Sequence, residues 1–413
     1  MKRIYLFFIS ILSLCIYAQT EVIPLANIGG VVLYNPSTND NSPFVEKGKQ
    51  LILKFDELNA SYKRYQYTFE YCNHDWTPST AFSSDYLQGF KQDFIRDYQN
   101  SFSTQQSYTH YSLAFPNENI NLKLSGNYII KIYDKDPKKP IFTKRFSIYE
   151  NTVGIQTELV PGGNLQTQQQ VNLTVNYDSN NANLTQNIQD VWGAIVKNFN
   201  WNEAKTDLKP TYTSANKLMF NTLNNAFDAG NEYRWLDTKL RDIKAITTAA
   251  IIRDSVSGIY HHYLSIDQNR AFQGYWNDED YQGGYYIRTV DHTNEDHIDT
   301  EADYIMVHFT YQPEEAFEDK DIYVVGAFNN WKLSSQNKMV YDAENKVYTC
   351  ELLLKQGTYN YRYQLSQKDS YTPAQETVEG NYWQTTNRYT SLLYYRPWGQ
   401  RYDLLIGIGE AGR

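Results

Sequence analysis

A histidine followed by an aspartate, at His74 and Asp75, is the first arrangement in this sequence that could carry chemistry. An imidazole beside a carboxylate suits general acid–base catalysis, and His110 is a candidate partner further along the chain. The pair comes directly before Trp76, at the end of a run that alternates like a β-strand. We favour a structural interpretation, in which a buried tryptophan anchors a core beside a histidine–aspartate hydrogen bond.

Histidines near acidic residues suggest metal binding at two further places. His292 and His297 lie in an acidic stretch, but their spacing does not place both imidazoles on one helix face, and the glycine of an EF-hand loop is missing. His261 and His262 are adjacent, so a strand would point them to opposite faces. We therefore predict a solvated acidic linker around His297, and no metal or cofactor site.

Other catalytic and nucleotide-binding signatures are missing from the sequence or lack their context. Residues 407–412 match G-x-G-x-x-G, but only one residue follows them, so the helix that would hold a pyrophosphate is not present. The sequence has no G-x-S-x-G, no H-E-x-x-H and no Walker loop. We expect a protein that is not an enzyme. A hydrolase using carboxylates that a single sequence does not reveal stays open as an alternative.

The elements that must position these residues are predicted to be short β-strands. Aromatic and β-branched residues favour strands, and the chain holds 37 tyrosines in 413 residues. Strand-like runs are found at 51–55, 65–71, 127–133, 142–149, 171–177, 192–197, 304–311, 322–326 and 357–363. The charged turn at 134–140 predicts a hairpin. For residues 236–252, propensity leaves a helix and a strand both open.

The fold-class prediction is all-β, with tandem immunoglobulin-like or early-set β-sandwich domains after a signal peptide. The predicted divisions are a signal peptide at 1–18, an N-terminal β-sandwich at 19–150, a second β-rich domain ending in an acidic loop at 151–298, and a C-terminal early-set-like β-sandwich at 299–413. An outer-membrane β-barrel is the alternative architecture. Lysines and arginines in the strands, without a continuous apolar outward face, argue against it.

The N-terminal segment predicts export. Lys2 and Arg3 precede an apolar stretch that ends at Ala18, which is the layout of a secretory signal peptide. Cys15 suggests a lipoprotein, but the leucine before it does not fit a lipobox. Removal of Lys2 and Arg3 would change the net charge from −9 to −11, and an acidic chain is a poor partner for nucleic acid.

Two cysteines, Cys72 and Cys350, remain in the predicted mature chain. Both sit in strand-like runs that are far apart in the sequence. A disulfide between them is open in an oxidising compartment, although two buried free thiols are the favoured prediction.

A more specific pattern lies in the C-terminal block, where residues 324–331 read VVGAFNNW and residues 357–363 read GTYNYRY. This pattern resembles the early-set sandwich of glycogen-binding modules. The resemblance implies that Trp331 stacks on a sugar, with Arg362 as a basic residue and Tyr371 in place of a second tryptophan. The same F-N-x-W turn is structural in many domains that bind no sugar, and we favour that structural role for Trp331.

An ordered set of motifs lies before Glu150: YQYTFEYCNHDW at 65–76, DYLQGF at 85–90, DYQNSFST at 97–104, YTHY at 108–111, PNE at 116–118 and SGNY at 125–128. This set resembles the plug-protein family of the type IX secretion system, found in gliding and secreting bacteria. The resemblance runs from about Gln19 to the C-terminus and is densest in the first block.

The resemblance implies a periplasmic protein that binds the giant outer-membrane β-barrel translocon and closes its periplasmic opening. Such a protein associates with the outer membrane through its partner, without direct insertion into the membrane. Stiff stacked sandwiches with shaped loops suit a stopper. The alternative function is a carbohydrate-binding module that uses Trp331 and Tyr371.

Overall fold

The computed structural model describes residues 18–178, 184, 187–291, 297–375 and 377–412, so that only Ala18 of the predicted signal peptide is described. Regular structure in these residues is almost entirely β-strand in antiparallel sheets, which confirms the all-β prediction. The short helices α1 and α3 span Ser83–Tyr86 and Ile298–Glu301. In this part of the chain, no helix has the length and apolar character that a membrane crossing requires.

The first pair of sheets is made by residues 28–149. Its strands are β1 Ile28–Tyr34, β2 Phe44–Glu46, β3 Leu51–Glu57, β4 Gln66–Cys72, β5 Leu87–Gly89, β6 Gln92–Phe94, β7 Asp97–Asn100, β8 Thr109–Phe115, β9 Ile120–Leu122, β10 Gly126–Tyr133 and β11 Phe142–Tyr149. One sheet has the order β1-β3-β8-β7 and the other β2-β11-β10-β4-β6, with β5 and β9 as a separate ribbon. The predicted hairpin is confirmed, because Ile132 of β10 pairs with Phe142 of β11.

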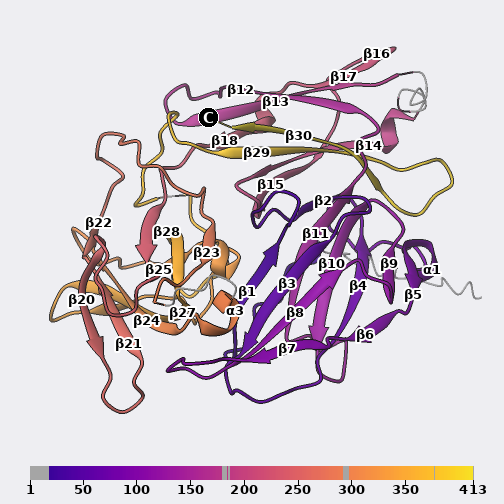
Figure 1. Ribbon diagram of the computed structural model, residues 1–413. Helices are drawn as coiled ribbons and strands as arrows, with labels where there is room; N and C mark the ends of the chain where they lie inside the picture. Colours follow the sequence, from indigo (N-terminus) through magenta and orange to yellow (C-terminus); the bar gives the residue numbers. More distant parts are fainter. Residues whose placement is uncertain (1–17, 179–183, 185–186, 292–296, 376, 413) are drawn as a thin grey trace, which may run out of the picture.

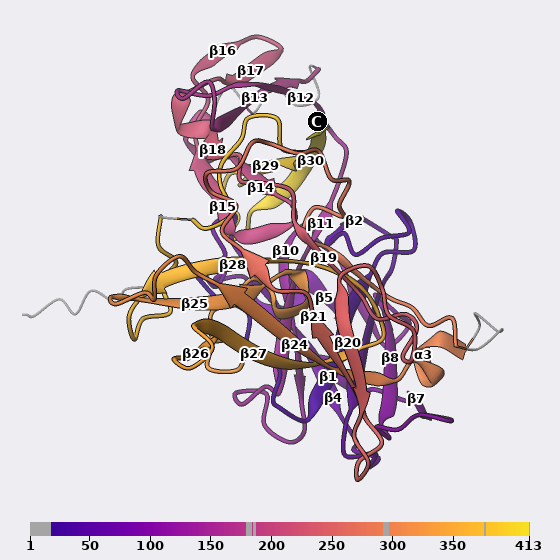
Figure 2. The same ribbon diagram turned by 90° about the vertical axis from the view of Figure 1, so that its left-hand side faces the viewer.

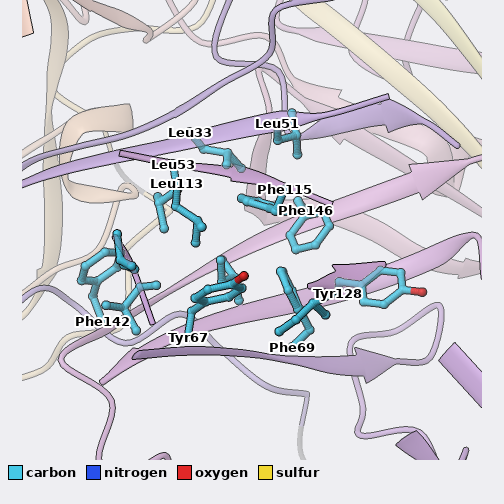
Figure 3. Close-up of a cluster of buried hydrophobic side chains, with 14 of the residues drawn as sticks. Leu33, Leu51, Leu53, Tyr67, Phe69, Leu113, Phe115, Tyr128, Phe142 and Phe146 are labelled. Carbon is cyan, nitrogen blue, oxygen red and sulfur yellow. The ribbon is translucent and has the colours of Figure 1, made fainter. Parts of the chain in front are cut away.

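Alternation of buried and part-exposed side chains explains why these segments form strands. In β4, Tyr67, Phe69 and Tyr71 are buried, whereas the residues between them are partly exposed. The buried side chains of the two sheets face each other across a dense core of aromatic and aliphatic groups (Figure 3). Within it the rings of Phe115 and Phe146 contact edge to face, with centroids 5.0 Å apart.

The second pair of sheets, called here the middle pair, combines two distant parts of the sequence. Its strands are β12 Gly154–Pro161, β13 Gln168–Asn176, β14 Val191–Lys197, β15 Asn200–Leu208, β16 Tyr212–Ser214, β17 Lys217–Phe220, β18 Ala226–Asp228, β29 Arg388–Tyr395 and β30 Leu404–Gly412. One sheet has the order β12-β13-β17-β16, with β18 beside β13, and the other the order β15-β14-β29-β30. The C-terminal strands therefore complete a sheet begun some 200 residues earlier, with Val191 paired to Tyr395.

Continuous burial explains this return of the chain. Six consecutive residues of β29, from Tyr389 to Tyr394, are buried, so both faces of the strand must be covered. A central position between β14 and β30 supplies that cover together with hydrogen bonds at both edges. Strand pairing thus groups residues 388–412 with the middle pair, not with the predicted C-terminal block at 299–413.

The third pair of sheets also crosses a predicted division. Its strands are β19 Arg234–Asp237, β20 Thr248–Arg253, β21 Tyr260–Leu264, β22 Asp267–Gln268, β23 Tyr285–Ile287, β24 Tyr304–Gln312, β25 Lys320–Val325, β26 Val340–Asp342, β27 Val347–Lys355 and β28 Gly357–Gln367. One sheet has the order β20-β21-β24-β27-β26, with β22 beside β24, and the other has β28 between β19 and β23, with β25 also beside β28. Because Arg234 pairs with Tyr361, this sheet pair spans the predicted division at residue 298. Residues 236–252 contain the end of β19, an irregular segment with turns and most of β20, which decides against the helix.

The three sheet pairs lie against one another, with the middle pair above the other two in both views (Figures 1 and 2). The first and middle pairs share a small hydrophobic cluster that includes Phe44, Leu392 and Leu405. Buried hydrogen bonds cross the same boundary, for example from the Tyr394 hydroxyl to Asn127 Oδ1 at 2.8 Å.

A buried ion pair joins the first pair of sheets to the third. Lys355 Nζ lies 2.6 Å from Asp56 Oδ2, and both side chains are almost fully buried. The Tyr304 hydroxyl donates to the same carboxylate at 2.7 Å, and His110 Nδ1 lies 2.6 Å from its other oxygen. Burial opposes the charge of Asp56, but Lys355 and His110 together lower the pKa of this carboxyl below its usual value.

We predict that Asp56→Asn lowers the free energy of unfolding by about 3–5 kcal/mol, because it leaves the Lys355 ammonium buried without its counter-charge. Urea denaturation of the purified chain measures the loss. Asp97→Asn, on the exposed strand β7, is the matched control and should change the stability by less than about 0.5 kcal/mol. Equal stability of the two variants would contradict this role of Asp56.

Candidate functional site

A cavity of about 190 Å³ lies where the three sheet pairs meet. Each pair contributes part of its wall. The lining includes Asp40, Lys144 and Arg145 from the first pair, Phe199, Trp201 and Arg388 from the middle pair, and Tyr281, Tyr285 and Trp331 from the third. A junction between domains, with aromatic walls and a few polar groups, is a common setting for a binding site.

Several hydrogen-bond donors at this cavity have no partner within the described residues. They are Nε1 of Trp201, Nε1 of Trp331 and Nε of Arg145. Arg145 is only 7% exposed, and its guanidinium lies 4.8 Å from the ring centroid of Trp76. Burying a donor without an acceptor costs free energy, so these three groups destabilise the junction, and because the atoms themselves are fully buried they offer no hydrogen bond to a ligand in the cavity.

The N-terminal segment of the described chain already occupies part of this wall. The Glu21 side chain accepts a hydrogen bond from the Arg145 backbone N–H at 2.6 Å. The carbonyls of Gln19 and Glu21 accept from the side chains of Arg145 and Lys332, respectively. This segment therefore provides acceptors for cations of the first and third sheet pairs. Burial lowers the pKa of Lys332.

Asp280 is a site residue that the sequence did not single out. Burial raises the pKa of its carboxyl to about 7, although the backbone N–H groups of Tyr233 and Gln282 donate to it at 2.5 and 2.7 Å. It begins a turn in which Gln282 and Gly283 both have positive φ, at 47° and 81°. The Gly283-Gly284 pair was the available signal for this turn, but the burial of Asp280 depends on contacts distant in sequence.

The structure places Trp331, Arg362 and Tyr371 in three different surroundings. Trp331 follows the 3-10 turn Ala327–Asn329, has φ of 50° and lines the central cavity. Arg362 lies on β28, lines another cavity and forms an ion pair with Glu203 of β15. Burial opposes the charge of Arg362, but Glu203 raises the pKa of the guanidinium above its usual value.

Tyr371 is 59% exposed, and its ring lies 6.2 Å from that of Tyr323. It lines neither the cavity of Trp331 nor that of Arg362. The three residues of the expected sugar-binding platform are therefore not gathered into one of these cavities.

His74 and His110 serve separate clusters. His74 Nδ1 lies 2.7 Å from Asp403 Oδ2, and His74 Nε2 lies 2.7 Å from Asp207 Oδ1. Trp76 is buried, as the structural interpretation requires. The carboxylates that bond to His74 belong to residues of the middle sheet pair, 133 and 329 residues away in the sequence. The neighbouring Asp75 is not one of these two partners.

The remaining sequence motifs have structural explanations. Gly407 and Gly409 lie in strand β30, where a Cβ atom would come within 2.7 Å of Val153 and 2.8 Å of Ile155. The glycines thus permit close contact between strands, with no link to nucleotide binding. Cys72 and Cys350 are buried free thiols, as favoured, and burial raises the pKa of each to about 12.

Histidines outside these clusters follow the predictions only in part. His261 Nδ1 lies 2.8 Å from His308 Nε2, whereas buried His262 bonds to the Arg241 carbonyl, so the adjacent histidines point to opposite faces. His292 lies outside the described residues. The prediction of a solvated acidic linker around His297 that continues to Asp303 is wrong for Asp303, because this residue is buried and accepts a hydrogen bond from the backbone N–H of Gln105 at 2.7 Å.

We predict that Asp280 makes the protein less stable as the pH rises from about 4 to about 7. The native carboxyl, with a pKa near 7, retains its proton over this range, whereas the unfolded one, with a value near 3.8, loses it. Asp280→Asn should remove this decline, and Asp278→Asn, at a neighbouring exposed position, should keep it. Urea unfolding at several pH values measures the effect, and parallel curves for all three proteins would contradict it.

Comparison with known proteins extends this description. A family model described as the type 9 secretion system plug protein first domain matches residues 28–150. A second, described as the glycogen recognition site of AMP-activated protein kinase, matches residues 314–391. No curated protein matches the chain in sequence.

A solved structure shares the whole fold. The crystal structure of a hypothetical protein from Parabacteroides merdae ATCC 43184 is 32% identical, with a TM-score of 0.88 over 96% of this chain and 100% of that one. The arrangement of three sheet pairs is therefore common to both proteins. Residues 28–150, which form the first sheet pair, therefore belong to the family of type 9 secretion system plug protein first domains.

Proposed function

We propose that this chain is a periplasmic subunit that binds the outer-membrane β-barrel translocon of the type IX secretion system and closes its periplasmic opening. The match of residues 28–150 to the plug protein first domain is the observation that carries the proposal. Export by a signal peptide at residues 1–18, immunoglobulin-like and early-set domain types, and a role without catalysis belong to the same proposal.

The way in which the sheet pairs are joined suits a stopper. A seal over a wide pore must keep its shape while the barrel presses on it, so its parts must not slide past one another. The C-terminal strands β29 and β30 tie the end of the chain into the middle pair. The Asp56–Lys355 ion pair holds the first and third pairs together from inside. Relative motion would separate these contacts in a buried setting, at a cost in free energy.

Exposed aromatic side chains in loops provide contact area for a partner. Trp398, in the loop between β29 and β30 at the right of Figure 1, is 85% exposed. Phe82 is 62% exposed, and the guanidinium of Arg401, from the same loop as Trp398, lies 5.2 Å from its ring centroid. Phe272 and Trp276, in the loop before β23, are 90% and 79% exposed. Aromatic residues of this kind often supply much of the energy of an interface.

We predict that affinity-tagged chain, purified from detergent-solubilised outer membranes of its own host, recovers a very large β-barrel protein. Mass spectrometry identifies what is recovered. Host cells that lack the chain should also admit large polar dyes that intact cells exclude. Absence of any large barrel in the purified material, with an equally tight outer membrane in the deletion strain, would contradict the proposal.

Two paired variants locate the contact face in the same experiment. One combines Phe82→Ala with Trp398→Ala, and the other combines Phe272→Ala with Trp276→Ala. All four side chains are exposed, so neither variant should change the stability by much. We expect one pair to reduce recovery of the barrel about tenfold or more and the other to leave it unchanged, since only one face can meet the opening. Full recovery with both pairs would exclude these loops as the contact.

A second candidate function is carbohydrate binding, favoured by the match of residues 314–391 to a glycogen recognition site. Because Trp331 lines the central cavity and Arg362 is paired with Glu203, a sugar would have to enter that cavity.

We predict a silent glycan array for the intact chain. Binding that is present in the intact chain and lost in Trp331→Ala would favour the second candidate instead.

A further inference from the structure

Three side chains with metal-binding atoms converge where the first sheet pair meets the middle pair. They are His74 and Asp75, in the turn that follows β4, and Asp207, near the end of β15. One ligand atom from each lies within 4.8 Å of the others. His74 is almost fully buried, whereas the Asp207 side chain is 61% exposed. The cluster therefore has a fixed inner side and an outer side that a solute can reach.

The inner side fixes the orientation of the imidazole. Asp403 Oδ2 lies 2.7 Å from His74 Nδ1 and also accepts the His74 backbone N–H at 3.0 Å. Asp403 is itself held by Arg396 Nε, 2.6 Å from its other oxygen. The ring stacks on Trp192, with centroids 4.2 Å apart. With its Nδ1 proton directed at Asp403, the imidazole turns Nε2 toward Asp207 and Asp75.

A histidine that donates through one nitrogen to a carboxylate and presents the other nitrogen outward is the common arrangement of a metal-bound histidine. Three carboxylates, Asp75, Asp207 and Asp403, surround this imidazole. Two cations lie near them, Arg396 and Lys209, the latter bonded to the carbonyls of Gln189 and Val191. Asp190 also lies near Lys209, so carboxylates outnumber cations around this imidazole, which favours a bound cation.

We propose that His74 Nε2, Asp75 and Asp207 bind a divalent transition-metal ion, best matched by zinc, at the junction of the first and middle sheet pairs. One imidazole nitrogen and two carboxylates form a ligand set that zinc accepts, with a water molecule as the fourth ligand. Calcium and magnesium prefer oxygen ligands throughout, so the nitrogen favours zinc over both.

The distance between His74 and Asp207 requires only a small adjustment. His74 Nε2 and Asp207 Oδ1 are 2.7 Å apart, as a hydrogen-bonded pair. Ligands at about 2.05 Å from a tetrahedral zinc ion are about 3.3 Å apart, so this pair must open by roughly 0.6 Å. The Asp207 side chain is the exposed member of the pair, so a change of its rotamer can open this distance while the buried histidine stays in place.

Metal binding would act across the same boundary as the contacts described above. His74 and Asp75 belong to the first sheet pair, and Asp207 belongs to the middle pair. A bound ion would join these two parts by coordinate bonds at the surface. Inside, the same two parts are joined by hydrophobic contact in the cluster that includes Phe44, Leu392 and Leu405. The proposal is independent of the translocon and holds for the isolated chain.

The test is zinc binding by the full mature chain after removal of metals with a chelator. We expect the native protein to bind one more equivalent of zinc than Asp207→Asn and His74→Gln, as measured by titration calorimetry. Zinc should raise the melting temperature of the native protein more than that of either variant. Cobalt as a probe should give visible absorption bands of nitrogen–oxygen coordination, and both variants should lose them.

Controls separate this site from other surface histidines and from misfolding. Asp97→Asn, at an exposed carboxylate on β7, should keep the full zinc stoichiometry. Asp207→Asn is the main variant because its exposed side chain can be replaced without disturbing a core, whereas His74→Gln tests the buried ligand. The same stoichiometry in the native protein and in Asp207→Asn would overturn the proposal, as would a native protein that binds no zinc.

Discussion

The buried contact between Asp56 and Lys355 sets the conditions for the rest of this structure. Two opposite charges have left water at the boundary of the first and third sheet pairs, and each needs the other to remain there. Tyr304 and His110 complete the surroundings of the carboxylate, so that both its oxygens are bonded. This ion pair requires the first and third sheet pairs to stay in close contact. A change in the angle between the sheets, or the entry of water between them, would separate each charge from its partner.

The path of the chain strengthens the same constraint. After it builds the third sheet pair, the chain returns to the middle pair, where β29 lies between β14 and β30. The third sheet pair is therefore inserted, in sequence, between two parts of the middle one, and the middle pair is complete only when residues 388–412 have joined it. The central cavity lies where all three meet, so the spacing of its walls depends on contacts with every part of the molecule. The proposed plug function rests on the family match of residues 28–150, and resistance to deformation suits a protein that closes an opening.

Local patterns in the sequence predicted the strands well, whereas partners distant in sequence were not predictable. Apolar residues at alternate positions, such as Tyr67, Phe69 and Tyr71, indicate a strand with one buried face, and this pattern can be read without knowing the fold. The sequence of β29 does not show that it pairs with β14, because any other buried strand could pair with it equally well. For the same reason His74 was noticed, but its partners Asp207 and Asp403 were not. Trp331 was recognised from its turn, yet its place at a cavity depends on two other sheet pairs.

The shared strands and the buried ion pair should make the three sheet pairs open as one body, and native-state hydrogen exchange in increasing denaturant tests this most directly. Amides of β3, β14 and β28, one strand from each pair, report on the separate parts. The account predicts that their opening free energies converge on one value, that of global unfolding, before the transition. Three distinct values, each with its own dependence on denaturant, would show independent domains and would contradict it.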